Sequence, residues 1–323
     1  MWIKSFVDCL DNATQSNPRI EDAIALKELQ LPKRIYKYRG DSTYSRTNLN
    51  TDTVWMASPD AYNDPYDCSF SVAEEQVVTA LKKSLIPEFA KVYKLVPMQV
   101  KDLLDRAASI GADPLTSLAD AAAKINGSSP GQNPQQMAEF VSLIAPKMIA
   151  NTIDFLRQWR KVTKICSFSA VNDSILMWGH YAQDHKGFCV EYDLEGLEGK
   201  HLLRKNLYPV IYTPSLYDLT SFIEKLVGPE REDFNSLAPL LAVLHKFVGW
   251  NYEEEWRSVQ FTSGIVADHN VAVPTPSRVF LGAKMTRDKA KEIAAICDAK
   301  SIKVLQMRMA NNRFELLPEA YIP

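Results

Sequence analysis

Two glutamates separated by one residue are the first candidates for chemistry in this chain. They lie in NYEEEWR at 251–257, and in an extended segment Glu253 and Glu255 point to the same side. Two carboxylates this close raise the pKa of at least one of them, and the pair invites a proton, a cation or an electron-poor transition state. The alternative is a solvated acidic turn that Arg257 partly neutralises. Because E-x-E pairs also arise by chance, the assignment depends on partners elsewhere in the chain.

Two serines on a predicted strand form the second candidate group. In CSFS at 166–169, Ser167 and Ser169 alternate with Cys166 and Phe168, so both hydroxyls are expected on one face. A nucleophilic Cys166 is a minor alternative, because the sequence gives it no obvious histidine partner. The five cysteines are far apart and never form a CxxC pair, so we expect small buried side chains rather than a disulfide framework or a zinc ribbon.

An arginine and two tyrosines earlier in the chain have the chemistry to recognise a ligand. Arg39 ends a predicted strand in YKYR at 36–39, where its planar guanidinium would suit a phosphate or a carboxylate. Tyr62 and Tyr66 flank a proline-containing turn and would stack on a planar ligand. An exposed strand-end arginine and an ordinary turn are the simpler explanations of these two segments.

The densest cluster of unusual residues is MWGHYAQDHKGFCVEYD at 177–193, which contains His180, Tyr181 and His185. A spacing of five places the two histidines on different faces of a helix. Asp184 and Glu191 do not complete a recognisable set of metal ligands. A structural histidine is the more ordinary interpretation of each, and we predict no metal site here.

Several common catalytic motifs are absent. The chain contains no G-x-x-x-x-G-K-[ST], no G-x-G-x-x-G, no G-x-S-x-G and no H-E-x-x-H. With 12 glycines in the chain, a glycine-lined phosphate cradle is not expected. Kinases, P-loop NTPases, Rossmann dehydrogenases and zincins are therefore poor fits.

The composition is that of an ordinary globular protein of 323 residues, with 46% apolar and 24% charged residues. A net charge of -2 argues against a protein that coats nucleic acid, and the basic run at 157–164 is equally well explained as a helix end carrying cations. No stretch approaches the roughly 20 apolar residues of a membrane span. Asp8 and Asp11 interrupt the apolar N-terminal segment, which then cannot act as a secretory signal. We expect a cytoplasmic protein.

The elements that must position these residues change in character along the chain. Residues 1–30 predict one or two short helices that separate near 16–18. From about 71 to 161 the apolar spacing is helical, with a polar break at 126–136 that predicts a mobile loop. Strands are predicted at 34–39, 53–58, 165–168, 186–194, 208–213, 255–261, 278–283 and 302–309, and later helices at 215–227, 235–249 and 286–299.

This order of elements predicts an α+β fold with a mixed or antiparallel β core and an inserted helical subdomain, rather than a regular βαβ alternation. The core domain is expected to comprise 1–71 and 162–323, and the helical insertion 72–161. The insertion separates Arg39 from Ser167 in the sequence. It must therefore loop out if these two residues are to meet.

Six segments together resemble a bacterial family known as domain-of-unknown-function family 2971. The matching words are YKYR (36–39), VWMASPDAYNDPYD (54–67), CSFS (166–169), MWGHYAQDHKGFCVEYD (177–193), YEEEWR (252–257) and FLGAKMT (280–286). The stretch 72–160 matches less clearly, as an insertion would. The family label carries no function. The association of some relatives with abortive infection and other antiphage loci implies a role in phage defence or as a toxin.

The order arginine, Ser-x-Ser, Glu-x-Glu more distantly resembles the R-S-E pattern of ADP-ribosyltransferases. That resemblance implies a split-sheet form of the β core and an ADP-ribosyltransferase or NAD glycohydrolase, with NAD as substrate and a protein or nucleic acid as acceptor. It implies that Arg39 binds NAD and that Ser167 and Ser169 shape the nicotinamide pocket. Glu255 would stabilise the oxocarbenium-like ribose, and Glu253 would orient the acceptor. The binding residues would include His180, and Tyr62, Tyr66 or Tyr181 would line the pocket. The pattern departs at Phe168, where threonine is usual.

Two other functional classes are compatible with the sequence. A metal-dependent hydrolase or nuclease would use His180, His185, Asp184 and Glu255 with a divalent ion. A non-enzymatic sensor or binding module would use the helical insertion to contact a partner protein of a defence system. Chelation would abolish the first activity and spare NAD chemistry. Removal of the Glu253 and Glu255 carboxylates would leave the effect of a binding module intact.

Overall fold

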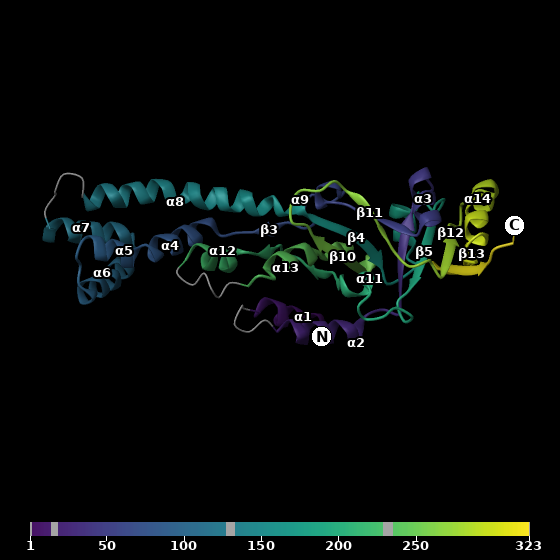
Figure 1. The fold of residues 1–323 in the computed structure, drawn as a ribbon, viewed down its shortest axis with the longest axis horizontal. Coiled ribbons are helices and arrows are strands. Elements are labelled where there is room, and N and C mark those ends of the chain that lie inside the picture. The colour runs from purple at the N-terminus through teal and green to yellow at the C-terminus, as the bar shows by residue number, and fades with distance from the viewer. Residues whose placement is uncertain (1, 14–18, 127–132, 229–234, 323) are drawn as a thin grey trace.

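A computed structural model describes residues 2–13, 19–126, 133–228 and 235–322. The molecule is elongated: a β-sheet core occupies one end, and helices extend from it as an arm (Figure 1). The predicted break between the N-terminal helices at 16–18 and most of the predicted loop at 126–136 lie outside the described residues.

The core of the described chain is an eight-stranded mixed sheet, which confirms the predicted α+β class and mixed β core. Neighbouring strands are antiparallel, except for one parallel pair, β12 with β13. The strands lie in the order β14 (Leu316–Ala320), β13 (Lys303–Met309), β12 (Arg278–Leu281), β5 (Phe188–Asp193), β1 (Arg34–Arg39), β4 (Thr163–Ser169), β10 (Glu255–Phe261) and β6 (Leu207–Pro209). Two-stranded sheets are formed by β2 (Thr53–Met56) with β11 (His269–Ala272), β3 (Phe70–Ser71) with β8 (Tyr217–Asp218), and β7 (Ile211–Thr213) with β9 (His245–Phe247).

Helices flank the sheet and build the arm. Around the sheet lie α1 (Trp2–Asp11), α2 (Ile20–Gln30), α3 (Thr43–Thr51), the 3-10 turn η1 (Pro59–Ala61), α10 (Ile175–Tyr181), α11 (Leu202–Lys205), α13 (Ala238–Leu244), the 3-10 helix η3 (Val248–Glu253) and α14 (Arg287–Asp298). Between β3 and β4 the chain forms α4 (Glu74–Ser84), α5 (Ile86–Val92), α6 (Pro97–Ile110), α7 (Pro114–Asn126), α8 (Pro134–Arg157) and α9 (Trp159–Val162). The helix α12 (Thr220–Val227) packs against α4 of the arm.

The arm consists of α4 to α8, with α8 running along its length (Figure 1). Ala145, Ile149 and Ile153 of α8 are buried at helical spacing against α4 and α12. No strand is found among the described residues between β3 and β4, as the predicted helical insertion requires. That residues 72–161 form a separate domain remains a prediction.

Different elements cover the two faces of the sheet. On one face, Ile35 and Phe188 pack with residues of α3, α14 and β2 in an apolar core. On the other face, α10 covers Tyr38, while α1 and α13 cover Ile165 and Val259. Alternate residues of a strand point to opposite faces of the sheet. The strand side chains that lie between α10 and α13 therefore belong to this second face.

The sheet opens between β1 and β4. In the described ranges these neighbours share a single paired position, Tyr36 with Ser169, whereas β10 pairs with β4 along its whole length. Side chains bridge the opening: Lys37 Nζ donates to Ser167 O at 2.6 Å, and Tyr38 OH donates to Val171 O at 2.9 Å. The centre of the sheet therefore has room for a pocket.

The helix predicted over 215–227 begins at Thr220, after the short strand β8. Two further predicted elements with wrong bounds lie near this opening. The helix predicted over 235–249 ends at Leu244, and the chain continues as β9, parallel to β7. The strand predicted over 208–213 is divided into β6 and β7. Continuous apolar runs are ambiguous, because periodicity alone does not separate a buried helix from a buried strand.

A close approach of backbone segments requires a glycine at position 187. A Cβ at Gly187 would lie 2.1 Å from Arg39 O and 2.9 Å from Ala182 O. Gln183, Asp184 and His185 all have positive φ, so the chain makes a tight turn between α10 and β5. The distinctive sequence around His185 is thus explained by backbone geometry.

We expect Gly187→Ala to destabilise the protein by about 1–3 kcal/mol or more, because the added methyl group meets backbone atoms that cannot rotate away. The matched control is Gly179→Ala in α10, where a Cβ would meet nothing within 4 Å. That control should be neutral or stabilising by about 0.5–1 kcal/mol. Urea unfolding of both variants measures the difference, and equal stabilities would contradict the packing described.

Candidate active site

A small pocket of about 200 Å³ lies at the opening between β1 and β4. Its walls come from β1, β4, α10, the loop after η1, and the segment from β9 to β10. The lining residues are Tyr36, Lys37, Tyr38, Tyr62, Asn63, Asp67, Ser167, Phe168, Ser169, Met177, Tyr181, Lys246, Glu253 and Glu255. The predicted carboxylates, serines and two of the predicted tyrosines therefore meet.

Glu253 and Glu255 enter the pocket from a turn rather than from an extended segment. Glu253 is the last residue of η3, Glu254 adopts the left-handed conformation with φ 43°, and Glu255 begins β10. Glu254 is exposed, whereas both neighbours are buried. The shared direction of the two carboxylates is as predicted, but a left-handed residue produces it instead of strand alternation.

A fully buried arginine organises the acidic side of the site. Arg257, with an exposed fraction of 0%, donates from Nε to Glu255 Oε1 at 2.8 Å and from Nη2 to Asp67 Oδ2 at 2.8 Å. Its Nη1 donates to Val243 O at 2.6 Å. Every arm of the guanidinium has an acceptor, which is how a buried cation is tolerated.

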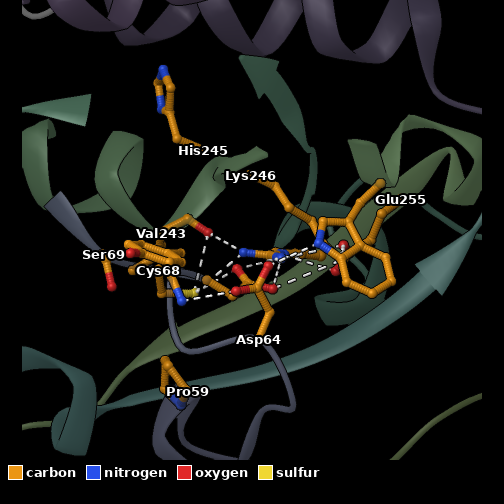
Figure 2. Close-up of polar contacts among 12 residues, drawn as sticks. Pro59, Asp64, Cys68, Ser69, Val243, His245, Lys246 and Glu255 are labelled. Carbon is orange, nitrogen blue, oxygen red and sulfur yellow. Dashed lines mark hydrogen bonds and ion pairs between the residues drawn. The ribbon is translucent and has the colours of Figure 1, made fainter. Parts of the chain in front are cut away.

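Lys246 joins the two glutamates. Its Nζ donates to Glu255 Oε2 at 2.7 Å and also to Glu253 Oε2, while Tyr181 OH donates to Glu253 Oε1 at 2.7 Å. Figure 2 shows Lys246 and Glu255 directed into this network and His245 directed away from it. The turn from α13 into β9 thus selects which of two adjacent basic residues reaches the pocket.

The two glutamates have opposite protonation behaviour. Burial raises the pKa of Glu253, and the neighbouring Glu255 raises it further, so that Lys246 offsets the effect only in part. Burial acts in the same direction on Glu255, but the cations Arg257 and Lys246 outweigh it and hold the pKa of that carboxyl well below its usual range. Glu255 is therefore a fixed anion, and Glu253 is the carboxyl able to exchange a proton.

The low pKa of Glu255 predicts a loss of stability in acid. A carboxyl whose pKa is lower in the folded than in the unfolded protein stabilises the fold at a pH above its unfolded pKa. This stabilisation is lost as the pH falls below about 5 toward the folded pKa. Glu253 has the opposite sign, because its raised pKa favours the protonated folded state. We expect the Glu255→Gln variant to lose less unfolding free energy than wild type between pH 7 and pH 4. Urea titrations measure this, with the exposed Glu254→Gln as control; equal losses would contradict the assignment.

The serines occupy two different environments. Ser169 pairs across the strands with Glu255, and its hydroxyl donates to Glu253 O at 2.6 Å while accepting from Val171 N at 3.1 Å. It therefore fixes the turn that carries the glutamates. Ser167 pairs with Arg257 and lines the pocket, where its hydroxyl lies near that of Tyr62.

Arg39 does not reach this pocket, and the predicted meeting of Arg39 with Ser167 and Glu255 is wrong. Arg39 pairs with Phe188, whose side chain lies in the apolar core on the opposite face. Arg39 shares that face with Ile35, because residues two apart on a strand point the same way. Lys37 belongs to the same strand face but lies at the opening between β1 and β4, where its Nζ donates to Ser167 O, whereas Arg39 is not among the residues that line the pocket.

Two further predicted residues lie beside the pocket rather than in it. Tyr66 lines an adjoining cavity. His180 is exposed and its ring lies 6.4 Å from that of Trp250 and 6.2 Å from that of Tyr252, among aromatic neighbours. Of the predicted aromatic walls, Tyr62 and Tyr181 are in place.

The sequence patterns pointed to Arg257 as a neutralising partner of the glutamates, but not to Lys246, Lys37 or Asp67 as residues of the site. Lys246 lies in a largely apolar segment that predicted a helix, and Asp67 lies in a segment that predicted a turn. Lys37 lines the pocket, and burial lowers its pKa. A lysine inside an apolar strand pattern is the signal that points to Lys37, and Arg257, two residues after Glu255, shares its strand face.

The side chains that a metal-dependent hydrolase or nuclease would use as metal ligands do not form a cluster in the described part of the chain. Among the described residues, no three His, Cys, Asp or Glu side chains are grouped as a metal site requires. His185 stacks on Trp178, and Glu255 is committed to Arg257. The cysteines are free thiols and buried, as expected, and Cys166 belongs to the core on the face opposite the pocket.

Residues 177–258 match the family model described as Protein of unknown function (DUF2971). The resemblance to this family is confirmed over that segment. The DUF2971 segment contains Tyr181, Lys246, Glu253 and Glu255 of the pocket. Comparison with curated proteins and with solved structures gives no match. In the described ranges, no helix is both long and apolar enough to span a bilayer.

Proposed function

We propose that the pocket is the active site of an enzyme that cleaves the N-glycosidic bond of NAD, as an NAD glycohydrolase or an ADP-ribosyltransferase. The observation that carries the proposal is the convergence of Glu253, Glu255, Ser167, Tyr62 and Tyr181 on one cavity. Carboxylates beside aromatic walls suit a reaction whose transition state is a cation. Arg39 has no part in this mechanism.

Carboxylates of the pocket can face a cationic substrate. Asp67, Glu253 and Glu255 surround Lys246 and Arg257, and Lys37 also lines the pocket, so three acids lie among three bases. The nicotinamide ring of NAD carries a positive charge, and it departs as a neutral ring with the electrons of its bond to ribose C1′. The fixed carboxylate of Glu255, together with Glu253, would stabilise the oxocarbenium-like ribose that remains.

Glu253 is assigned as the general base. Its carboxyl, with a raised pKa, would accept the proton of water or of an acceptor hydroxyl as that oxygen adds to ribose C1′. Tyr181 and Lys246 hold the carboxyl in place through its two oxygens. Glu255 keeps Lys246 and Arg257 in position and supplies fixed negative charge.

Tyr62 supplies a group that a ligand would satisfy. Its hydroxyl is buried and, among the described residues, makes no hydrogen bond of good geometry, although the Ser167 hydroxyl lies near it; its ring lines the pocket and lies 5.9 Å from the Arg257 guanidinium. A buried hydroxyl without a partner costs free energy. The carboxamide of nicotinamide would provide both a donor and an acceptor there.

The direct test is to incubate the purified chain with NAD and measure released nicotinamide, first with water as the sole acceptor and then with host protein, RNA or DNA. We expect nicotinamide release, and a mass gain of one ADP-ribose unit on an acceptor if the enzyme is a transferase. No release under any of these conditions would remove the proposal. Chelation should leave the activity unchanged.

A role in phage defence or as a toxin follows if NAD is consumed in cells. Induced expression of the chain would lower the cellular NAD pool and arrest growth, since NAD supports central metabolism. The Glu253→Gln variant would do neither at equal protein level. Growth arrest with an unchanged NAD pool would separate toxicity from this enzyme activity.

The helical arm supports a second candidate, a non-enzymatic contact with a partner protein. Met137, Phe140, Met148 and Phe155 of α8 are exposed apolar residues on one side of the helix. Exposed apolar patches of this kind mark interaction sites. If Glu253→Ala and Glu255→Ala left an antiphage effect intact, the contact would carry the function and the enzyme proposal would fail.

A further inference from the structure

The small pocket is too small to hold a whole dinucleotide. Its volume is about 200 Å³, whereas pockets that enclose small-molecule ligands measure about 300–1,000 Å³. A second cavity of about 470 Å³ adjoins it and shares Asn63 and Lys246 as lining residues. The two cavities therefore meet at Asn63 and Lys246, and a ligand with its reacting end beside Glu253 would have to pass Lys246 to reach the larger cavity.

The larger cavity has aromatic walls. Tyr66, Phe247 and Trp250 line it, and Tyr66 is 68% exposed, so its ring is open to a ligand. Trp250 is held in place because its Nε1 donates to Asp64 Oδ2 at 2.8 Å. Fixed and exposed rings around one hollow suit a planar heterocycle, which gains most of its binding from stacking.

We propose that this second cavity binds the adenine base of NAD against Tyr66 and Trp250, with the nicotinamide end in the small pocket. The assignment rests on the function proposed above. Lys246, common to both cavities, then lies beside the part of the substrate that joins the two halves. Tyr66 stacks on a planar group, as its sequence context predicts, but on adenine rather than on nicotinamide.

Binding of AMP to the full chain tests the base site separately from catalysis. Tyr66→Ala and Trp250→Ala should each weaken AMP binding about tenfold or more, as loss of one aromatic stacking partner does. Tyr44→Ala and Trp55→Ala are matched controls, because both side chains are exposed and line neither cavity. They should bind AMP like wild type. Calorimetry measures all five proteins.

Turnover of two substrates completes the test. Tyr66→Ala and Trp250→Ala should raise KM for NAD about tenfold or more and leave KM for nicotinamide mononucleotide, which lacks adenosine, unchanged. Absence of AMP binding by wild type, or equal AMP affinity in wild type and both variants, overturns the base site. AMP binding that depends on Tyr66 without nicotinamide release from either substrate would support the base site while removing the proposed reaction.

Discussion

Glu253→Gln should lower the rate of nicotinamide release from NAD by about 10²–10⁴-fold, the usual contribution of a general base. The amide keeps the size of the carboxyl but cannot accept the proton, and burial, which raises the pKa of Glu253, already disfavours the charge that the substitution removes. It retains an oxygen that can accept from Tyr181 or Lys246. The variant should therefore fold and lose catalysis, which steady-state kinetics together with a thermal melt would show.

The neighbouring Glu254→Gln is the matched control for this prediction. Glu254 carries the same side chain one residue away, but it is exposed and lies outside the pocket. It should keep the wild-type rate. An active Glu253→Gln protein, or equal losses in both variants, would show that Glu253 is not the base. The rate of wild type should also rise with pH through a pKa above that of an ordinary glutamate.

Arg257→Met should destabilise the protein by about 3–5 kcal/mol, because it leaves buried carboxylates without their cation. Glu255 would keep only Lys246 within hydrogen-bond distance, and Asp67 would lose its 2.8 Å contact. The Val243 carbonyl would also lose a donor. Unfolding in urea at pH 7 measures this change directly.

An exposed ion pair provides the comparison. Arg157 pairs with Asp154 at 2.9 Å on the surface of α8, and Arg157→Met should change stability by about 0–1 kcal/mol. In a double-mutant cycle, Glu255→Leu combined with Arg257→Met should cost less than the sum of the two single changes, because the pair acts as a unit. A single Arg257→Met cost near that of Arg157→Met would contradict a tightly packed charge network.

Local sequence was enough to predict much of the fold. The segments 34–39 and 255–261 are strands with the predicted bounds, and α14 differs from its predicted range by one residue at each end. In each case β-branched and aromatic residues, or helical spacing with clear turns, pointed to one structure. The order of the strands in the sheet could not be predicted from the sequence, because it depends on contacts between segments far apart in the chain.

Two of the acids and both serines of the site were predictable from the sequence, but Asp67, Lys37 and Lys246 were not. The spacing of Glu253 and Glu255, and of the two serines in 166–169, indicates these residues in the sequence. Arg39 was misplaced because the face to which it points depends on the register of β1 against β5, which sequence spacing leaves open. Lys246 was missed because the chain changes from helix to strand at His245, inside a continuous apolar run.

A crystal structure of the slow Glu253→Gln variant with NAD would test the location of the active site most directly. We predict the nicotinamide ring in the pocket between β1 and β4, near Tyr62 and Tyr181, with ribose C1′ facing residue 253. NAD bound on the opposite face near Arg39, or no bound NAD in crystals whose pocket is open to solvent, would contradict the proposed active site.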